Sequence, residues 1–378
     1  MSISLLEGIS LPQVISQMNE WLLKSEIQLS HGPEAGGIAG WLTEQDLPEY
    51  VYMEITGYYL SSMAFIADKT ESSTTRDLAL DRANRALDWL YSYVSRQELP
   101  PTRKYIAEPG GGDWRNTALF AFDIGMVVRG LCDIRPYLSG PKHYKIMQYL
   151  LTRLSDYITQ DYSLRPLILS DPNHILPVKW STTHGPYHLK VVSAVFSLPP
   201  ELVTANLRKL AHNVYSTWSE YCDEVEITED LHPTLYYLEG MVQFALNNYE
   251  YNSLDKIAKL FTKILSYQMM DGSLPYNPVS AQSVLRADVQ FQALRMGAIL
   301  LNFGYFHEPE WSDKLNRLCL AAMRFVGDSG AVSFHPIDPA HPQHWNAWCT
   351  MFAQQALSYY NDVVNGKSLT EQELSQIV

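Results

Sequence analysis

Six segments of the chain follow one pattern, in which a polar or aromatic start gives way to an apolar helix. They begin at Glu54, Asp123, His184, His232, Asp288 and Trp345. Five of them carry a glycine, and these lie at Gly57, Gly125, Gly185, Gly240 and Gly297. Successive glycines are 68, 60, 55 and 57 residues apart, which leaves room for two helices and their connections. A repeat at this period constrains the fold more than any single motif does.

Amphipathic stretches lie upstream of most of these segments, as at residues 78–94, 144–158 and 254–269. Their apolar residues recur at helical spacing, so we expect them to be partner helices. Strand-like alternation is almost absent. The pattern predicts an all-α fold, an (α/α)6 toroid of six helical hairpins with an inner and an outer ring of helices. We expect one domain over residues 1–378, in which residues 361–378 form a frayed tail with a short terminal helix.

Composition excludes several classes of protein. The chain is 46% hydrophobic and 12% aromatic, enough for a large core and an aromatic cavity. A net charge of -13 with only 28 Lys and Arg argues against nucleic acids and anionic membranes as partners. The four cysteines form no CxxC pair, and the first residues lack the basic start of a signal peptide. We therefore expect a cytoplasmic protein with reduced thiols. The sequence leaves the oligomeric state open.

Chemistry is expected at the starts of the six segments, because the inner helices of a toroid run the same way and their first residues meet at one mouth. Carboxylates and imidazoles are costly to bury there unless they are paired or used. The predicted catalytic residues are Glu54, Asp123, His232, Glu239 and Asp288. The predicted substrate-binding residues are Tyr58, His184, His188, Tyr236, Gln292, Arg295, Trp345 and Trp348.

Four motifs resemble those of a known group of folds. They are the QxxDG pattern at Gln268–Pro275, the HxxxYxxEG helix at His232–Met241, YxEITGY at Tyr52–Tyr58 and FDIG at Phe122–Gly125. Together they resemble the (α/α)6 toroid proteins of the six-hairpin glycosidase-like or prenyltransferase-like kind associated with bacterial saccharide processing. The resemblance runs roughly from residue 36 to residue 360. It implies the fold and leaves the activity open, since these toroids include hydrolases, lyases, epimerases and isoprenoid enzymes.

The carboxylates Glu54, Asp123, Glu239 and Asp288 can supply a protonated acid and an ionised base in one cavity. Two such groups flanking a glycosidic bond would suit its cleavage. The alternative is structural: Glu54 and Asp123 cap their helices, where acids are favoured by the dipole and the free N–H groups.

His232, Tyr236 and Glu239 are spaced i, i+4 and i+7, which places them on one helical face. An imidazole oriented by a carboxylate and lying beside a phenol suits the proton abstraction of a lyase or an epimerase. Alternatively, Tyr236 and Glu239 satisfy each other or a neighbouring helix while His232 caps. Arg295 could bind an anionic ligand group, or it could pair internally with Asp288 on its own helix.

His184 and His188 have the HxxxH spacing of some metal sites, but no carboxylate lies between them. We therefore expect them to contact a substrate or a partner helix, and we expect neither a metal nor an obligatory cofactor. Trp345 and Trp348 lie at the proposed mouth, where aromatic faces can stack on sugar rings or isoprenoid chains.

The leading hypothesis is a carbohydrate-active enzyme that binds a saccharide or sugar conjugate and uses acid/base catalysis. Hydrolysis, elimination and epimerisation remain open, as does the identity of the small-molecule or oligosaccharide substrate. A second hypothesis is an isoprenoid-handling enzyme, although the chain has neither a DxDD motif nor a cysteine near Asp288 to bind zinc. A third is a non-catalytic toroid that binds a glycan or a peptide.

Overall fold

The computed structural model describes residues 10–106, 112–224, 230–248, 250–306, 308–338, 340 and 343–378. The chain divides into two compact units. The first comprises Met1–Ser25 and Glu220–Ile377, and the second comprises Glu26–Ser219 together with Val378. No helix in the described part of the chain is long and apolar enough to cross a membrane.

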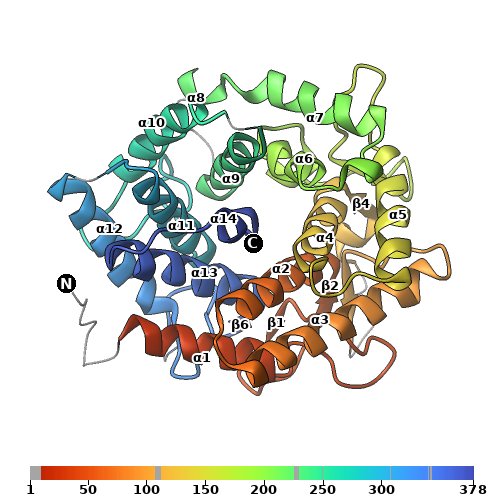
Figure 1. Ribbon diagram of the computed structural model, residues 1–378, viewed down its shortest axis with the longest axis horizontal. Coiled ribbons are helices and arrows are strands. Elements are labelled where there is room, and N and C mark those ends of the chain that lie inside the picture. The colour runs from red at the N-terminus through yellow and green to blue at the C-terminus, as the bar shows by residue number, and fades with distance from the viewer. Residues whose placement is uncertain are drawn as a thin grey trace. The chain divides into compact units, whose positions relative to one another are not determined.

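Helical hairpins build the second unit. Its described residues form three of them: α2 (Met53–Lys69) with α3 (Ser73–Val94), α4 (Ala121–Ile134) with α5 (Pro141–Ser155), and α6 (His188–Phe196) with α7 (Ala205–Trp218). In each pair the first helix is buried on nearly all sides, whereas the second buries one apolar stripe. Figure 1 shows α3, α5 and α7 covering one side of the row formed by α2, α4 and α6. We call α2, α4 and α6 the inner helices of this unit.

Short strands precede two of these inner helices. β2 (Tyr50–Tyr52) pairs antiparallel with β3 (Arg103–Tyr105), and β4 (Ala118–Phe120) pairs antiparallel with β5 (Leu167–Leu169). The unit also contains β1 (Trp41–Leu42) and three 3-10 helices, which are η2 (Trp114–Thr117), η3 (Trp180–Thr182) and η4 (Pro200–Leu202). The strand pairs fix the backbone immediately before α2 and α4, where the candidate carboxylates lie.

The first unit repeats the hairpin scheme. Inner helix α9 (Leu231–Asn248) packs with α10 (Ser253–Ser266), and inner helix α11 (Ala287–Asn302) packs with α12 (Pro309–Ala322). Inner helix α13 (Ala347–Val364) packs with α1 (Leu11–Lys24), from the opposite end of the sequence. The remaining elements are α8 (Tyr221–Glu224), η5 (Met323–Phe325), β6 (Trp345–Asn346) and α14 (Glu371–Ser375). In Figure 1, α14 lies on the side of α9 and α11 that faces away from α10 and α12.

The prediction of helices for the six sequence segments is confirmed. They form α2, α4, α6, α9, α11 and α13. The partner assignment was partly wrong, because the outer helices follow their inner helices instead of preceding them. Residues 78–94, for example, belong to α3, which packs on α2 and α5. Only residues 70–72 separate α2 from α3, so the chain folds straight back, whereas a long connection leads from α3 to α4.

The end of the chain differs from the expectation of a frayed tail. The short terminal helix is present as α14, and Thr370 and Glu373 form a capping box at its start. Leu369, Leu374 and Ile377 are buried. Apolar residues at the end of the segment give it a surface to bury, which holds it in place. The expectation of a single domain stays a prediction.

The QxxDG motif shapes the turn before α11. The Gln268 side chain donates to the backbone carbonyls of Gly272 and Lys314, which ties the turn to α12. Gly272 has a φ of 87°, and a Cβ there would lie 2.4 Å from the Arg317 carbonyl oxygen. Asp271 pairs with Arg324 at 2.9 Å. In this structure the motif therefore joins a hairpin together and contributes no group to the candidate sites described below.

Two glycines bring α2 and α4 into backbone contact. A Cβ on Gly57 would lie 2.5 Å from the Met126 carbonyl group, and a Cβ on Gly130 would lie 2.2 Å from the Gly57 carbonyl oxygen. Real Cβ atoms do not approach other atoms so closely. The repeated glycine at position 57 is therefore required by packing between inner helices.

We expect Gly57→Ala to lower the free energy of unfolding by at least about 1–3 kcal/mol, because the added methyl group forces two packed backbones apart. Chemical denaturation followed by circular dichroism would measure the loss. Gly140→Ala is the matched control, since nothing lies within 4 Å of a Cβ at that position. Equal denaturation midpoints for the two variants would contradict the close contact between α2 and α4.

Candidate functional site

Polar and ionisable side chains of the inner helices, together with residues of the preceding loops, form one cluster in each unit. In the second unit the carboxylate cluster consists of Tyr52, Glu54, Tyr58, Thr102 and Asp123. In the first unit the histidine cluster consists of His232, Glu239, Asp288, Gln292 and Arg295. Apart from Tyr52, every one of these side chains is buried.

Helix packing brings Glu54 and Asp123 together. Glu54 lies three residues before Gly57 on α2, and Asp123 lies three residues before Met126 on α4. Gly57 and Met126 mark the backbone contact between the two helices. Three residues correspond to a rise of about 4.5 Å, so both carboxylates lie almost one turn from the contact, toward the helix starts. The glycine of the repeat thus makes the approach of the two acids possible.

Burial raises the pKa values of both carboxyl groups. Glu54 is 9% exposed, and its loss of hydration raises its pKa to about 7, although hydrogen bonds from the Tyr52 and Tyr58 hydroxyls act in the opposite direction. Burial also raises the pKa of Asp123 well above its usual range, and the neighbouring charge of Glu54 raises it further. The Thr102 hydroxyl donates to Asp123 at 3.0 Å. Both carboxyl groups therefore hold a proton to higher pH than exposed carboxyl groups do.

Arg103 is a positive charge that acts on both members of this pair. It follows Thr102 on β3, and its charge lowers the pKa of both Glu54 and Asp123. Its guanidinium lies 4.5 Å from the centre of the Tyr50 ring and 3.6 Å from the Asp113 carboxylate. Because Arg103 is also engaged by these groups, it offsets only part of the rise in the two pKa values, and no ion pair between Arg103 and either acid occurs among the described residues.

Glu54 and Asp123 lie in the first turns of α2 and α4, as the capping alternative expected, but neither is an N-cap residue. The N-cap residues of α2 and α4 are Tyr52 and Phe120, and neither forms a side-chain cap hydrogen bond. Glu54 and Asp123 instead accept hydrogen bonds from the side chains of Tyr52, Tyr58 and Thr102. Tyr52 and Thr102 were missed as site residues. Tyr52 stands within the YxEITGY motif and could have been found, whereas Thr102 comes from a loop with no pattern of its own.

His184 and His188 lie together at the start of α6. Their ring centroids are 4.8 Å apart, with His184 exposed and His188 fully buried. Burial and the charge of His184 lower the pKa of His188 to about 3, so its imidazole is neutral. Neither ring nitrogen of His188 has a hydrogen-bond partner among the described residues. A buried polar ring of this kind is suited to hydrogen bonding with a ligand or an ordered water molecule.

The histidine cluster is built by facing positions of α9 and α11. His232 Nδ1 lies 2.6 Å from Gln292 Oε1, and Gln292 Nε2 donates to Glu239 Oε1 at 3.3 Å. Arg295 donates to the same Glu239 oxygen and forms a fully buried ion pair with it. Glu239 therefore interacts with a neighbouring helix, as one of the two sequence alternatives held. Its ion pair with Arg295 favours a positioning role over that of an acid or a base.

Asp288 pairs with Arg286, two residues before it, and the predicted alternative of an internal pair with Arg295 is wrong. Burial alone would raise the pKa of Asp288, but Arg286 and His232 hold it below its usual value. These neighbours favour the ionised form of Asp288, and its role as a further acid stays a prediction. Its Oδ2 lies 3.6 Å from His232 Nδ1. Burial lowers the pKa of His232, so the ring is neutral at neutral pH.

The predicted aromatic residues have different surroundings. The Tyr236 ring lies against His232, with centroids 4.4 Å apart, and is buried. Trp348 contacts Phe334 at 5.8 Å between centroids. Trp345 belongs to β6 and lies over Gly327, where an added Cβ would meet its ring at 2.8 Å. Trp345 and Trp348 are partly exposed, and their role in binding substrate stays a prediction.

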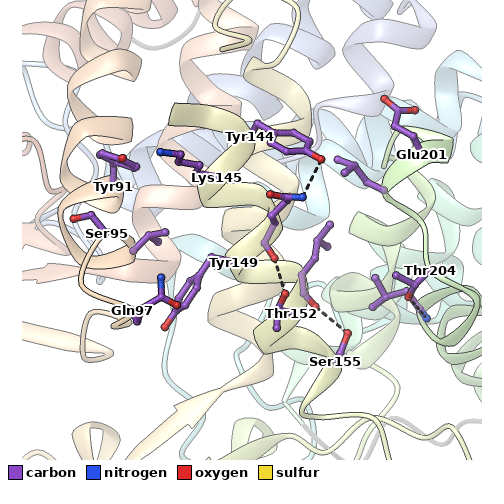
Figure 2. Close-up of a pocket in the computed structure, with 15 residues that line it drawn as sticks. Tyr91, Ser95, Gln97, Tyr144, Lys145, Tyr149, Thr152, Ser155, Glu201 and Thr204 are labelled. Atoms are coloured by element: carbon purple, nitrogen blue, oxygen red, sulfur yellow. Dashed lines mark hydrogen bonds between the residues drawn. The ribbon is translucent and has the colours of Figure 1, made fainter. Parts of the chain in front are cut away.

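A separate groove of about 750 Å³ lies between the end of α3, the outer face of α5 and the start of α7. Figure 2 shows Tyr144, Tyr149 and Gln97 around it. Gln148 donates to the Tyr144 hydroxyl at 2.9 Å. Lys145 and Glu201 are the charged residues of its lining. Because this lining brings no pair of acids together, we locate the chemistry in the two clusters.

Across the described residues, no group of three or more histidines, cysteines or acids is arranged to hold a metal ion. His184 and His188 therefore have no third ligand of these types in the described part of the chain.

Comparison with known proteins identifies similar solved structures. No family model matches the chain, and no curated protein matches it. An unsaturated glucuronyl hydrolase specific for heparin is similar with a TM-score of 0.67 at 8% identity, over 95% of this chain and 99% of that one. A cellobiose 2-epimerase from Bacillus thermoamylovorans has a TM-score of 0.66 at 11% identity, over 91% and 99%. A sugar epimerase from a ruminal bacterium has a TM-score of 0.67 at 11% identity, over 94% and 100%.

These similarities confirm the predicted fold class. The chain has the all-α (α/α)6 toroid fold, and the resemblance to six-hairpin glycosidase-like proteins is confirmed at the level of the fold. Identities of 8–11% carry no residue roles from those proteins to this one.

We expect the buried Glu54 to make the protein less stable as the pH rises. An unfolded glutamate ionises near ~4.3, whereas folded Glu54 keeps its proton up to about 7. Unfolding therefore releases a proton between these values, and stability falls with rising pH. Glu54→Gln has no such proton to release. From pH 5 to pH 8, the free energy of unfolding of the variant should therefore rise by about 2–3 kcal/mol relative to that of the unchanged protein.

Urea denaturation at both pH values would measure this gain, and Glu71→Gln on the exposed surface is the control. If the difference between Glu54→Gln and the unchanged protein were the same at pH 5 and pH 8, Glu54 would not carry a raised pKa.

Proposed function

We propose that this protein is a saccharide-processing enzyme that cleaves a glycosidic bond with Asp123 as proton donor and Glu54 as base. The observation that carries the proposal is the buried pair itself, in which burial raises both pKa values and the charge of Glu54 raises that of Asp123 further. Carboxyl groups separated in acidity by their surroundings are how one site supplies an acid and a base at neutral pH. Similar solved structures include unsaturated glucuronyl hydrolases, which supports a saccharide as the substrate.

In the proposed reaction the protonated Asp123 donates its proton to the leaving-group oxygen as the glycosidic bond breaks. Ionised Glu54 accepts a proton from the water molecule whose oxygen bonds to the sugar carbon. The hydroxyls of Tyr52 and Tyr58 stabilise the ionised form of Glu54 by donating to it. Thr102 holds the Asp123 carboxyl in place. The isoprenoid alternative lacks a comparable argument, since neither cluster presents the acid motif that such chemistry requires.

We expect Glu54→Gln and Asp123→Asn each to lower kcat/KM by about 10²–10⁴-fold, because each removes one partner of the proton transfer. Unsaturated glucuronyl disaccharides and cello-oligosaccharides are the first substrates to test, with released sugar as the readout. The pH profile of kcat/KM should fall below about pH 7 as Glu54 takes up a proton. It should fall again at higher pH as Asp123 loses its proton.

Asp133→Asn is the matched control for these variants. Asp133 lies on the same helix as Asp123, is 7% exposed and has a pKa raised by burial. It is already engaged by Ser61 at 2.6 Å and by Arg129 at 3.7 Å. The control should change stability and leave turnover intact. Turnover that survives both Glu54→Gln and Asp123→Asn would overturn the proposal, and binding without any turnover would favour a glycan-binding toroid.

A second candidate function is epimerisation of a sugar at His232. A buried neutral imidazole, bonded through Nδ1 to Gln292, can present its other nitrogen as a base. The similar structures include sugar epimerases. In this reaction His232 removes a proton from the carbon next to an open-chain sugar carbonyl. A proton then returns to the opposite face of that carbon, so substrate and product have the same atoms.

We expect the protein to exchange deuterium from heavy water into the carbon next to the carbonyl of cellobiose or a related sugar, if this second function holds. His232→Asn should reduce that exchange by about 10²-fold or more, since it removes the base. Mass spectrometry of the recovered sugar measures both. His212, an exposed histidine on outer helix α7, gives the control variant His212→Asn. If the His232→Asn variant and the unchanged protein exchanged deuterium at the same rate, His232 would not be the base.

A further inference from the structure

A continuous chain of buried hydrogen bonds links the end of the polypeptide to His232. We call residues Leu369–Ile377 the C-terminal segment. The chain begins at the backbone carbonyl of Gln376 in this segment and passes through Gln355 of α13. It continues through Arg295 and Gln292 of α11 and Glu239 of α9, and it ends at His232 Nδ1. All of these residues belong to the first unit.

The first link of this chain has a fixed direction. A backbone carbonyl can only accept a hydrogen bond, so Gln355 must turn its NH₂ group toward Gln376, at 2.7 Å. The amide oxygen of Gln355 then faces the other way and accepts from Arg295 Nη1 at 2.8 Å. The C-terminal segment therefore decides which way the Gln355 amide points.

Arg295 transmits that direction to Glu239. A guanidinium has donors and no acceptor, so Arg295 can only donate to Gln355 on one side and to Glu239 on the other. The plane of the group also lies 4.8 Å from the centre of the Phe352 ring, which restricts its rotation. Arg295 and Glu239 are 0% and 1% exposed, so water does not compete with these contacts.

Gln292 completes the chain and decides the position of a proton. The Glu239 carboxylate paired with Arg295 is an acceptor, so Gln292 must turn its NH₂ group toward it. The Gln292 oxygen then faces His232 Nδ1 at 2.6 Å, and this contact is a hydrogen bond only when Nδ1 carries the proton. The lone pair of the neutral ring is thereby placed on Nε2.

We propose that Arg295, Gln355 and the C-terminal segment are positioning elements that hold His232 in the tautomer with its proton on Nδ1 and its lone pair on Nε2. This inference deepens the second candidate function and rests on it, because an imidazole acting as a base needs its lone pair on one defined ring nitrogen. None of the three positioning elements needs to touch the substrate. An apolar residue would cost less to bury than Arg295 does between two inner helices. The positioning role gives the buried arginine a function.

The C-terminal segment is anchored well enough to serve as the start of such a chain. Gln243 of α9 donates to the Leu374 carbonyl at 2.6 Å, and the Tyr359 hydroxyl donates to the Glu373 carbonyl. The Leu369 N–H donates to Asn302 of α11 at 2.7 Å. These anchors come from α9, α11 and α13, so the position of the segment depends on all three inner helices of its unit.

Nuclear magnetic resonance of protein labelled with 15N-histidine tests the proposal directly, because the shifts of the two ring nitrogens reveal which one carries the proton. His232→Asn identifies the His232 signals among those of the 11 histidines. We expect the unchanged protein to show a protonated Nδ1 and an unprotonated Nε2. A proton on Nε2, or on both nitrogens at neutral pH, would overturn the inference without any activity measurement.

Gln355→Met tests the link to the C-terminal segment, since it keeps the length of the side chain and removes both hydrogen bonds. We expect a mixture of tautomers at His232, with the deuterium exchange defined above slowed about tenfold in kcat and KM changed less than about twofold. Gln354→Met is the matched control, because Gln354 is an equally buried neighbour on α13 and is not in the chain. An unchanged His232 spectrum in Gln355→Met would also overturn the inference.

Arg295→Lys provides a second variant if Gln355→Met does not fold. A lysine keeps the charge beside Glu239 but lacks the planar fork that contacts two partners at fixed angles, so a shift toward the other tautomer is again expected. A tautomer shift in either variant, combined with deuterium exchange that does not depend on His232, would support the positioning role and reject the epimerase function. The two proposals can therefore fail separately.

Discussion

The cost of burying ionisable groups at the starts of the inner helices is the constraint on which both clusters depend. Each inner helix is packed on nearly all sides, so a carboxylate in its first turn has little access to water. Such a group must keep its proton or find a cation. Glu54 and Asp123 follow the first route, with raised pKa values and hydroxyl donors. Glu239 and Asp288 follow the second, with Arg295 and Arg286 as partners.

These two solutions give the clusters different chemical abilities. A buried acid pair with raised pKa values can donate one proton and accept another, which is what bond cleavage by acid/base catalysis requires. Carboxylates neutralised by arginines exchange protons less readily, but they are fixed acceptors that orient the groups around them. In the histidine cluster the oriented group is His232, and the ordering extends through Gln355 to the C-terminal segment. The unit that holds the ion pairs is thus suited to holding one imidazole in a defined tautomer.

Much of the candidate site could be predicted because the repeat marks it. Glu54, Asp123, His232 and Asp288 all stand where a polar start meets an apolar helix, and that pattern is visible without coordinates. The pairing of Asp288 with Arg286 was missed although Arg286 is only two residues away, because sequence spacing does not show which cation a side chain reaches. Thr102 and Gln355 were missed for a different reason. Thr102 lies in a loop without a recognisable pattern. Gln355 is one of two adjacent buried glutamines on α13, and only the packed structure shows that it is the one that contacts Arg295.

The sequence by itself determined the class of the fold and the positions of the candidate site residues. Helical periodicity and a repeated glycine are local patterns, so the order of residues along the chain is enough to show them. It also carried the apolar residues Leu369, Leu374 and Ile377 that order the end of the chain, although the pattern was too short to predict burial. Only the tertiary structure decided which acids keep their protons and which are paired. Acidity depends on burial and on charges within a few ångströms, and residues as distant in sequence as Glu239, Arg295 and Gln376 become neighbours only when the helices pack.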